Sequence, residues 1–214
     1  MGRAQHELTS LRVLYNKVST SRNFADVDLP RYETYRRTIS RFRKDGQPEN
    51  PRTMEEFSEQ LKGPFQDRTL IMGEISYVGT IRGNEDEGIT IIFMTPETKR
   101  LLRKAKDFYV DGTFDAAPSF HHQCQQLLVI MAKSFGYGFP IIFALMSRKT
   151  QSAYERLIQF VVGVESNWSP NTVMSDFETA IYNSFENHFP NCQHSGCFFH
   201  LGQAVWKRVQ SVGK

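Results

Sequence analysis

The sequence has few cysteines, no long apolar stretch and little net charge, and each shortage excludes a class of protein. Its three cysteines, Cys124, Cys192 and Cys197, are too few for a disulfide framework and fit a reducing, intracellular compartment. No apolar run approaches the roughly 20 residues that span a bilayer, and the polar first residues carry no signal-peptide core, so we expect neither a membrane protein nor an exported one. The net charge of +3 alone does not predict a nucleic-acid partner.

Aromatic residues are plentiful by contrast, with 17 Phe and 8 Tyr, and 40% of the chain is hydrophobic. Disordered chains lack such side chains, and 214 residues suffice for one substantial hydrophobic core. The patterns divide the chain into a basic, mostly helical N-terminal region over residues 1–65 and an α/β core over residues 70–214.

The N-terminal region is predicted to be helical because apolar residues recur at helical spacing in two stripes. The stripes are Leu8, Leu11, Leu14 and Val18, and then Tyr32, Tyr35, Ile39 and Phe42. Thr53 and Glu56 resemble a capping box that opens a third, short helix through Leu61. Basic residues surround the second stripe, and the candidates for contact with DNA phosphates are Arg36, Arg37, Arg41, Arg43 and Lys44. A solvated basic helix that packs on the core is the alternative interpretation.

The core alternates between strand and helix patterns. The predicted strands are Leu70–Met72, Tyr77–Ile81, Ile89–Met94, Asp107–Phe114, Gln126–Lys133, Phe139–Arg148, Asn171–Ser175 and Gly196–Phe199. The predicted helices begin at Pro96 and cover Ser152–Glu165, Phe177–His188 and Leu201–Val209. In the last five strands, three antiparallel neighbours precede two strands that return through helical crossovers. We therefore expect an RNase H-like mixed sheet with flanking helices.

Two aspartates, Asp111 and Asp176, each close a short apolar run that is typical of a buried strand. A carboxylate there is costly to bury unless it accepts hydrogen bonds or binds a cation. If the two strands lie side by side, the carboxylates form a divalent-metal site of the kind that cuts and joins phosphodiester bonds. The alternatives are structural, because Asp111-Gly112 is a common turn dipeptide and Ser175 with Glu178 could form a capping box.

Several separate motifs follow one another along the core. They are Asp111–Phe114, Leu127–Met131, Phe139–Met146 followed by Lys149 and Tyr154, Met174–Ala180, Phe189-Pro190 and Gly196–Ala204. In this order they resemble the Mutator-like element (MULE) transposases, from about Ile91 to Gln210. The resemblance implies an RNase H-like fold and DDE-type DNA strand cleavage and transfer that depends on Mg²⁺ or Mn²⁺. It also implies transposon-end DNA as the partner, a nuclear location, and Asp111 and Asp176 as the first two catalytic, metal-binding carboxylates; a homo-oligomer is left open.

Two features depart from the family's pattern. The family's third catalytic residue is a Glu well beyond the second Asp, and nothing before the last residue, Lys214, matches it. Many relatives carry an N-terminal Cys/His zinc finger, whereas residues 1–90 hold no Cys and a single His, His6. We therefore expect a truncated or decayed transposase core that does not cut DNA alone. The alternatives are a non-enzymatic DNA-binding or regulatory protein derived from a transposon, and an interaction domain without a nucleic-acid partner.

Four potential metal ligands, Cys192, His194, Cys197 and His200, lie within nine residues of one another. Two Cys and two His suit tetrahedral zinc, although ligands spaced this closely would make an unusual finger. The resemblance matches Cys197 and His200 to a Cys/His pair of the family that is thought to support the active site. The preferred interpretation is structural packing, with active-site support and a zinc site as alternatives.

Overall fold

The chain divides into two units, Met1–Asn50 and Pro51–Lys214, each described here by itself. The computed structural model describes residues 10–20, 31–45, 49–63, 70–71, 74–113 and 116–212. None of the helices in these ranges has the length and apolar character needed to cross a bilayer.

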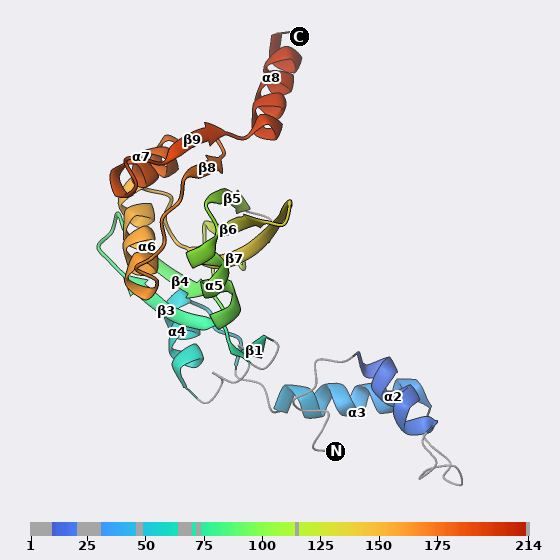
Figure 1. Cartoon of the computed structure of the whole chain (residues 1–214). Coiled ribbons are helices and arrows are strands. Elements are labelled where there is room, and N and C mark those ends of the chain that lie inside the picture. The colour runs from blue at the N-terminus through green and yellow to red at the C-terminus, as the bar shows by residue number, and fades with distance from the viewer. Residues whose placement is uncertain are drawn as a thin grey trace. The chain divides into compact units, whose positions relative to one another are not determined.

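The first unit contains two helices, α2 (Leu11–Ser19) and α3 (Tyr32–Asp45), labelled in Figure 1. They pack through aromatic edges, because the Tyr15 ring lies 5.5 Å from the Tyr32 ring and 5.3 Å from the Tyr35 ring, measured between centroids. Two residues of the second predicted stripe therefore face α2, through Tyr15, which is not a member of the first predicted stripe. Leu8, and the side chains of Leu14, Phe42, Arg43 and Lys44, lie outside what the structure describes.

The second unit is built on a seven-stranded mixed sheet. Its strands are β3 (Tyr77–Arg82), β4 (Ile89–Phe93), β5 (Asp107–Thr113), β6 (Gln126–Ser134), β7 (Tyr137–Met146), β8 (Thr172–Ser175) and β9 (Gln193–Gly196). Its helices are α4 (Met54–Lys62), α5 (Pro96–Lys104), α6 (Gln151–Val164), α7 (Thr179–His188) and α8 (Phe198–Val212). Two short strands, β1 (Leu70–Ile71) and β2 (Glu74–Ile75), form a separate hairpin.

The strand order across the sheet is β3-β4-β7-β6-β5-β8-β9. Strands β5, β6 and β7 are antiparallel neighbours, whereas β8 pairs in parallel with β5 and β9 pairs in parallel with β8. The first pair of the β5–β8 register, Asp107 and Thr172, is also joined by a 2.8 Å hydrogen bond from the Thr172 hydroxyl to the Asp107 carboxylate. The mixed α/β architecture is confirmed, and its strand order is compatible with the expected RNase H-like fold.

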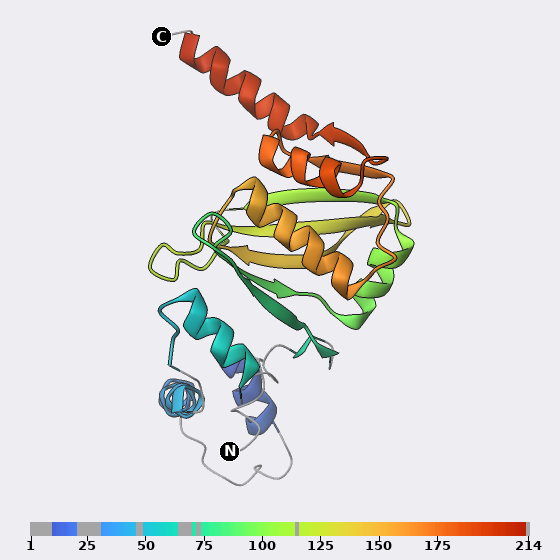
Figure 2. The same ribbon diagram turned by 90° about the vertical axis from the view of Figure 1, so that its left-hand side faces the viewer.

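The sheet contributes to two hydrophobic cores, because successive strand residues point to opposite sides. Ile92 of β4 belongs to the main core, which α5, α6 and α7 close from one side. Figure 2 shows α6 lying across the strands on that side. The neighbouring Ile91 belongs to a smaller core on the other side, where Met54 and Leu61 of α4 pack against β4 and β7. Helix α4 is thus part of the second unit.

Helix starts follow the capping signals in the sequence. The Thr53 hydroxyl accepts the Glu56 N–H at 3.1 Å, as the expected box requires, but the Glu56 carboxylate accepts the N–H of Arg52 rather than that of Thr53. Thr95 caps α5, with Pro96 as its first residue. Both helices therefore begin where the sequence predicts.

Several boundaries differ from the prediction, most clearly at β7, β9 and α8. Strand β7 starts at Tyr137, because the turn after β6 takes only Phe135 and Gly136, whose φ angles of 50° and 81° lie in the left-handed region. The predicted strand Gly196–Phe199 is wrong, since β9 ends at Gly196. The two phenylalanines that suggested a strand, Phe198 and Phe199, are exposed and form the first turn of α8.

Candidate carboxylate site at the ends of β5 and β8

Asp111 and Asp176 lie at the same edge of the sheet. The parallel register of β5 and β8 ends with Val110 paired to Ser175, and each aspartate is the next residue of its chain segment. Neighbouring strands run about 4.8 Å apart, so the two residues follow adjacent backbones at the same level. The predicted meeting of the two strands is confirmed.

The environment of Asp111 is that of a strand and not of a turn. Its backbone pairs with Val129 of β6, and Gly112 continues the ladder opposite Leu128. The turn interpretation of Asp111-Gly112 is therefore wrong. The Asp111 side chain is 51% exposed, and its Oδ1 lies 3.9 Å from Nε2 of His200 in α8. A carboxylate this exposed is accessible to solvent ions and to a nucleic-acid strand.

Asp176 occupies the short segment between β8 and α7. Its Oδ1 accepts a long, 3.4 Å hydrogen bond from the Glu178 N–H, and its carbonyl accepts the Ser175 hydroxyl at 2.8 Å. Glu178 is the N-cap of α7, with no side-chain capping bond. The capping-box interpretation of Ser175 and Glu178 is thus wrong, and the contact of the Asp176 carboxylate with the Glu178 N–H is a weak one.

Glu178 is held by two other side chains. Its Oε1 accepts the Tyr154 hydroxyl at 2.8 Å, and its Oε2 lies 3.0 Å from the Lys149 ammonium. Burial raises the pKa of Tyr154 far above its ordinary value, and the negative charges of Glu178 and Asp176 raise it further, so this phenol stays protonated as a donor. Both oxygens of Glu178 are engaged.

A buried glutamine extends this contact toward Asp111. Gln126, fully buried at the start of β6, donates from Nε2 to the Tyr154 oxygen at 2.7 Å. Its Oε1 has no hydrogen-bond partner among the described residues, and a Cβ added to Gly112 would lie 2.6 Å from it. The residue after Asp111 must therefore be small. We call Gln126, Tyr154 and Glu178 the buried polar chain. It links the start of β6 to the segment that follows Asp176.

The sequence signals for the buried polar chain were incomplete. Tyr154 stood out only as part of a motif, and Gln126 only as the first residue of a strand. The usable signal is the alternation along β6, where Gln126 occupies the same buried face as Leu128, Ile130 and Ala132. A glutamine at a core position requires a buried polar partner.

The Cys/His residues surround the site but do not converge. His194 Nε2 lies 2.8 Å from the Ser175 hydroxyl, and burial lowers the pKa of His194, which favours the neutral ring. The Cys197 N–H donates to the Ser175 carbonyl at 2.7 Å, and Cys192 packs against the main core. Across the described ranges, no three His, Cys, Asp or Glu side chains are grouped so that they could hold a metal ion.

The donor set at the two strand ends is nonetheless of a hard-oxygen type. Magnesium is commonly bound by one or two carboxylates, keeps several waters and takes further ligands from phosphates. Asp111 and Asp176 supply two carboxylates at adjacent strand ends. Two carboxylates are ligands of the type that Mg²⁺ accepts, whereas both oxygens of Glu178 already have partners.

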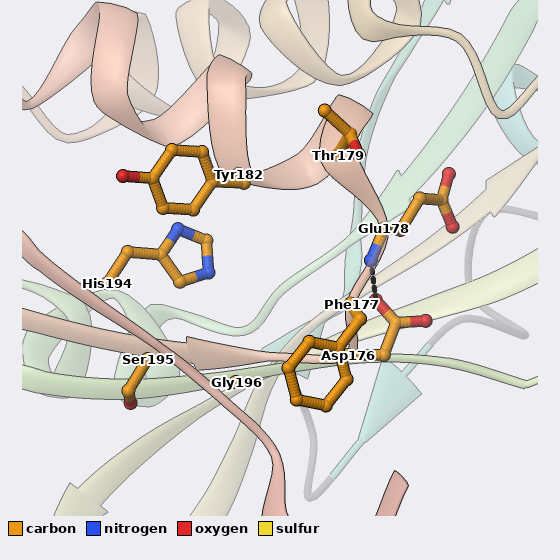
Figure 3. A pocket seen from close by; sticks show the side chains of 8 residues that line it. All are labelled: Asp176, Phe177, Glu178, Thr179, Tyr182, His194, Ser195 and Gly196. Carbon is orange, nitrogen blue, oxygen red and sulfur yellow. Dashed lines mark hydrogen bonds between the residues drawn. The ribbon is translucent and has the colours of Figure 1, made fainter. Parts of the chain in front are cut away.

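A pocket of about 320 Å³ opens beside Asp176. Its lining comes from the start of α7 and from β9, and comprises Asp176, Phe177, Glu178, Thr179, Tyr182, His194, Ser195 and Gly196. Figure 3 shows the rings of Tyr182 and His194 facing each other at one end and the carboxylates of Asp176 and Glu178 at the other. The lining therefore combines aromatic faces with acidic groups and contains no Lys or Arg.

Comparison with known proteins identifies the segment that contains this site. Residues 108–204 match the family model described as MULE transposase domain. The match begins at the start of β5 and ends in α8, and so includes Asp111, Asp176 and every residue of the pocket lining. A search of curated proteins found no match.

Proposed function

We propose that this transposase-derived chain, whose residues 108–204 match the MULE transposase domain, binds transposon-end DNA through a DDE-type site. Asp111 and Asp176 are the two carboxylates that hold Mg²⁺ or Mn²⁺ in this proposal. The observation that carries it is the parallel pairing of β5 with β8 up to Val110 and Ser175, directly before the aspartates. A nuclear location follows from the same proposal, since transposon DNA is the substrate.

The fold assignment that goes with this proposal is RNase H-like. The order β7-β6-β5-β8-β9, with α6 and α7 as the crossovers between parallel strands, supports it. In this arrangement functional side chains collect where the first and fourth strands of the core end together. When bound, the metal would activate water or a 3′-hydroxyl and stabilise the oxygen that leaves the phosphodiester.

We propose further that the residues present here do not cut DNA by themselves. The family chemistry uses three acidic residues, and Glu178, the nearest further acid in sequence, is held by Tyr154 and Lys149. Releasing Glu178 would leave the buried Tyr154 hydroxyl without its hydrogen-bond acceptor, which is costly. Metal binding without strand cleavage is the expected behaviour.

A metal titration tests the site directly. We expect Mn²⁺, followed by electron paramagnetic resonance, to bind the full chain weakly and to lose this binding in Asp111→Asn and in Asp176→Asn. The matched control is Asp86→Asn, which removes an exposed carboxylate in the loop between β3 and β4. Equal Mn²⁺ binding in all four proteins would contradict the assignment of the aspartates.

A cleavage assay tests the second part. Purified chain with Mg²⁺ or Mn²⁺ is expected to leave terminal-repeat DNA intact. Robust cleavage that disappears in Asp176→Asn would overturn the proposed inactivity while supporting the carboxylate site.

A non-enzymatic DNA-binding protein is the second candidate, and the surface of α3 favours it. Arg36, Arg37 and Arg41 are exposed on this helix, and each phosphate contact would add about 0.9 to the slope of log affinity against log salt. We expect the triple alanine variant to bind DNA more weakly and with a flatter slope. A charge-matched control replaces three basic residues of α5: Lys99, Arg100 and Lys104. An unchanged slope in the α3 variant would count against a phosphate role.

A further inference from the structure

The pocket beside Asp176 presents aromatic rings to solvent. Phe177 is 60% exposed and Tyr182 is 43% exposed. Exposed rings that line a pocket can stack against a bound ligand, whereas an isolated phenylalanine on the surface has no pocket beside it.

Contacts with β9 hold the aromatic side chains of the lining in position. The Phe177 ring lies directly over Gly196, where an added Cβ would overlap its edge. Tyr182 stacks on His194 at 4.8 Å between centroids with an interplanar angle of 24°, and His194 in turn contacts the buried Ser175 through its 2.8 Å hydrogen bond. The rings are therefore ordered before any ligand arrives, which lowers the entropy cost of binding.

The charges of the lining select the kind of group that fits. Asp176 and Glu178 are acidic, His194 is neutral because burial lowers its pKa, and the lining contains no Lys or Arg. The lining offers a phosphate no Lys or Arg, whereas a neutral, flat ring with N–H donors at its edge would meet aromatic faces and the Asp176 carboxylate, because both oxygens of Glu178 already have partners. The volume of about 320 Å³ lies at the low end for small-ligand pockets and suits one such ring.

We propose that this pocket receives one unpaired nucleobase of the DNA strand whose backbone lies at Asp111 and Asp176, with Phe177 as the stacking residue. The inference deepens the proposed function and rests on it, because Asp176 lines both the pocket and the carboxylate site. Stacking on an aromatic side chain tolerates any base, so the pocket would fix the position of the strand without reading its sequence.

The test uses the full chain and single-stranded DNA that carries 2-aminopurine, a base whose fluorescence reports stacking. In a series of oligonucleotides, 2-aminopurine is moved one position at a time, with Ca²⁺ as the divalent ion, and affinity is followed separately by anisotropy of an end label. We expect a fluorescence change confined to one position. Phe177→Ala should abolish that change and weaken binding about 5- to 150-fold, the effect of losing one stacked base at a tenfold change per 1.4 kcal/mol.

Three further variants separate stacking from folding. Phe177→Trp should keep the fluorescence change, because it retains a stacking face. Gly196→Ala should reduce it, because the added Cβ displaces the Phe177 ring. Phe135→Ala, which removes a 91% exposed phenylalanine from the β6–β7 turn, is the control and should bind like the unaltered chain.

The outcomes are distinguishable. DNA binding with no position-specific fluorescence change, or with a change that survives in Phe177→Ala, overturns the pocket and leaves the proposed function standing. Failure of the unaltered chain to bind DNA overturns both. If Phe135→Ala reduces the fluorescence change as much as Phe177→Ala does, the stacking is nonspecific, and the pocket proposal is also overturned.

Discussion

Replacing Tyr154 with Phe removes a single oxygen from the middle of the buried polar chain. That oxygen accepts the Gln126 amide at 2.7 Å and donates to Glu178 at 2.8 Å. Tyr154 is 2% exposed and Gln126 is fully buried, so water does not replace the lost partners. The substitution leaves the ring and its packing in place and isolates the hydrogen bonds.

The expected cost follows from these two contacts. The Gln126 Nε2 would keep only a 3.5 Å contact with the Met146 sulfur, and a buried amide that loses its oxygen acceptor costs about 1–3 kcal/mol; its Oε1 has no partner among the described residues. Loss of a hydrogen bond to a carboxylate costs about 1.5–3 kcal/mol, reduced here because Lys149 stays 3.0 Å from Glu178. Since coupled contacts do not add fully, we expect Tyr154→Phe to lower the free energy of unfolding by about 2–4 kcal/mol.

Urea unfolding measures this change as a lower midpoint at an unchanged slope. The double variant Tyr154→Phe with Gln126→Leu should recover part of the loss, because it removes the orphaned amide. Tyr137→Phe, at a tyrosine that is 71% exposed, serves as the control and should stay within about 0.5 kcal/mol of the unaltered chain. A Tyr154→Phe effect as small as that of the control would refute the reasoning.

Three further changes test other parts of the second unit. Gly112→Ala should cost about 1–3 kcal/mol in urea unfolding, because its Cβ would lie 2.6 Å from the buried glutamine oxygen; a neutral result would mean that this oxygen moves freely. Gly88→Ala should cost more than Gly136→Ala, since both have positive φ but only at Gly88 would a Cβ meet a neighbour, Ser147; equal midpoints would contradict this. The lowered pKa of His194 means that the unfolded chain takes up a proton below about pH 6.5 that the folded chain does not, so stability falls as pH falls through that window. His194→Gln should remove this part of the pH dependence of urea unfolding, and an unchanged profile would contradict it.

The strand arrangement that forms the site was predictable from the sequence. Each of the runs before Asp111 and Asp176 is apolar and bounded by turn or helix signals, and the helix between them requires a crossover that makes the two strands parallel. The rules on connections between strands therefore predict that the two segments end at the same edge of the sheet. The structure adds the register, with Val110 opposite Ser175.

Contacts between side chains of different strands and helices were harder to predict from the sequence. Gln126 and Tyr154 are 28 residues apart, and periodicity places each of them on a buried face without saying which buried polar groups meet. The end of β9 shows a different difficulty, because Phe198 and Phe199 favour a strand by composition. In the structure these rings are exposed at the start of α8, where the chain has already left the sheet.

The parallel pairing of β5 with β8 also affects how the chain folds during synthesis. Asp107 and Thr172 are 65 residues apart, so β6 is synthesised and can pair with β5 well before its second neighbour, β8, exists. Until β8 arrives, one edge of β5 offers unpaired backbone groups beside apolar side chains, and such edges promote aggregation. Translation that stalls between β7 and β8 would thus leave an aggregation-prone sheet edge, with Asp111 in place but without the strand that leads to Asp176.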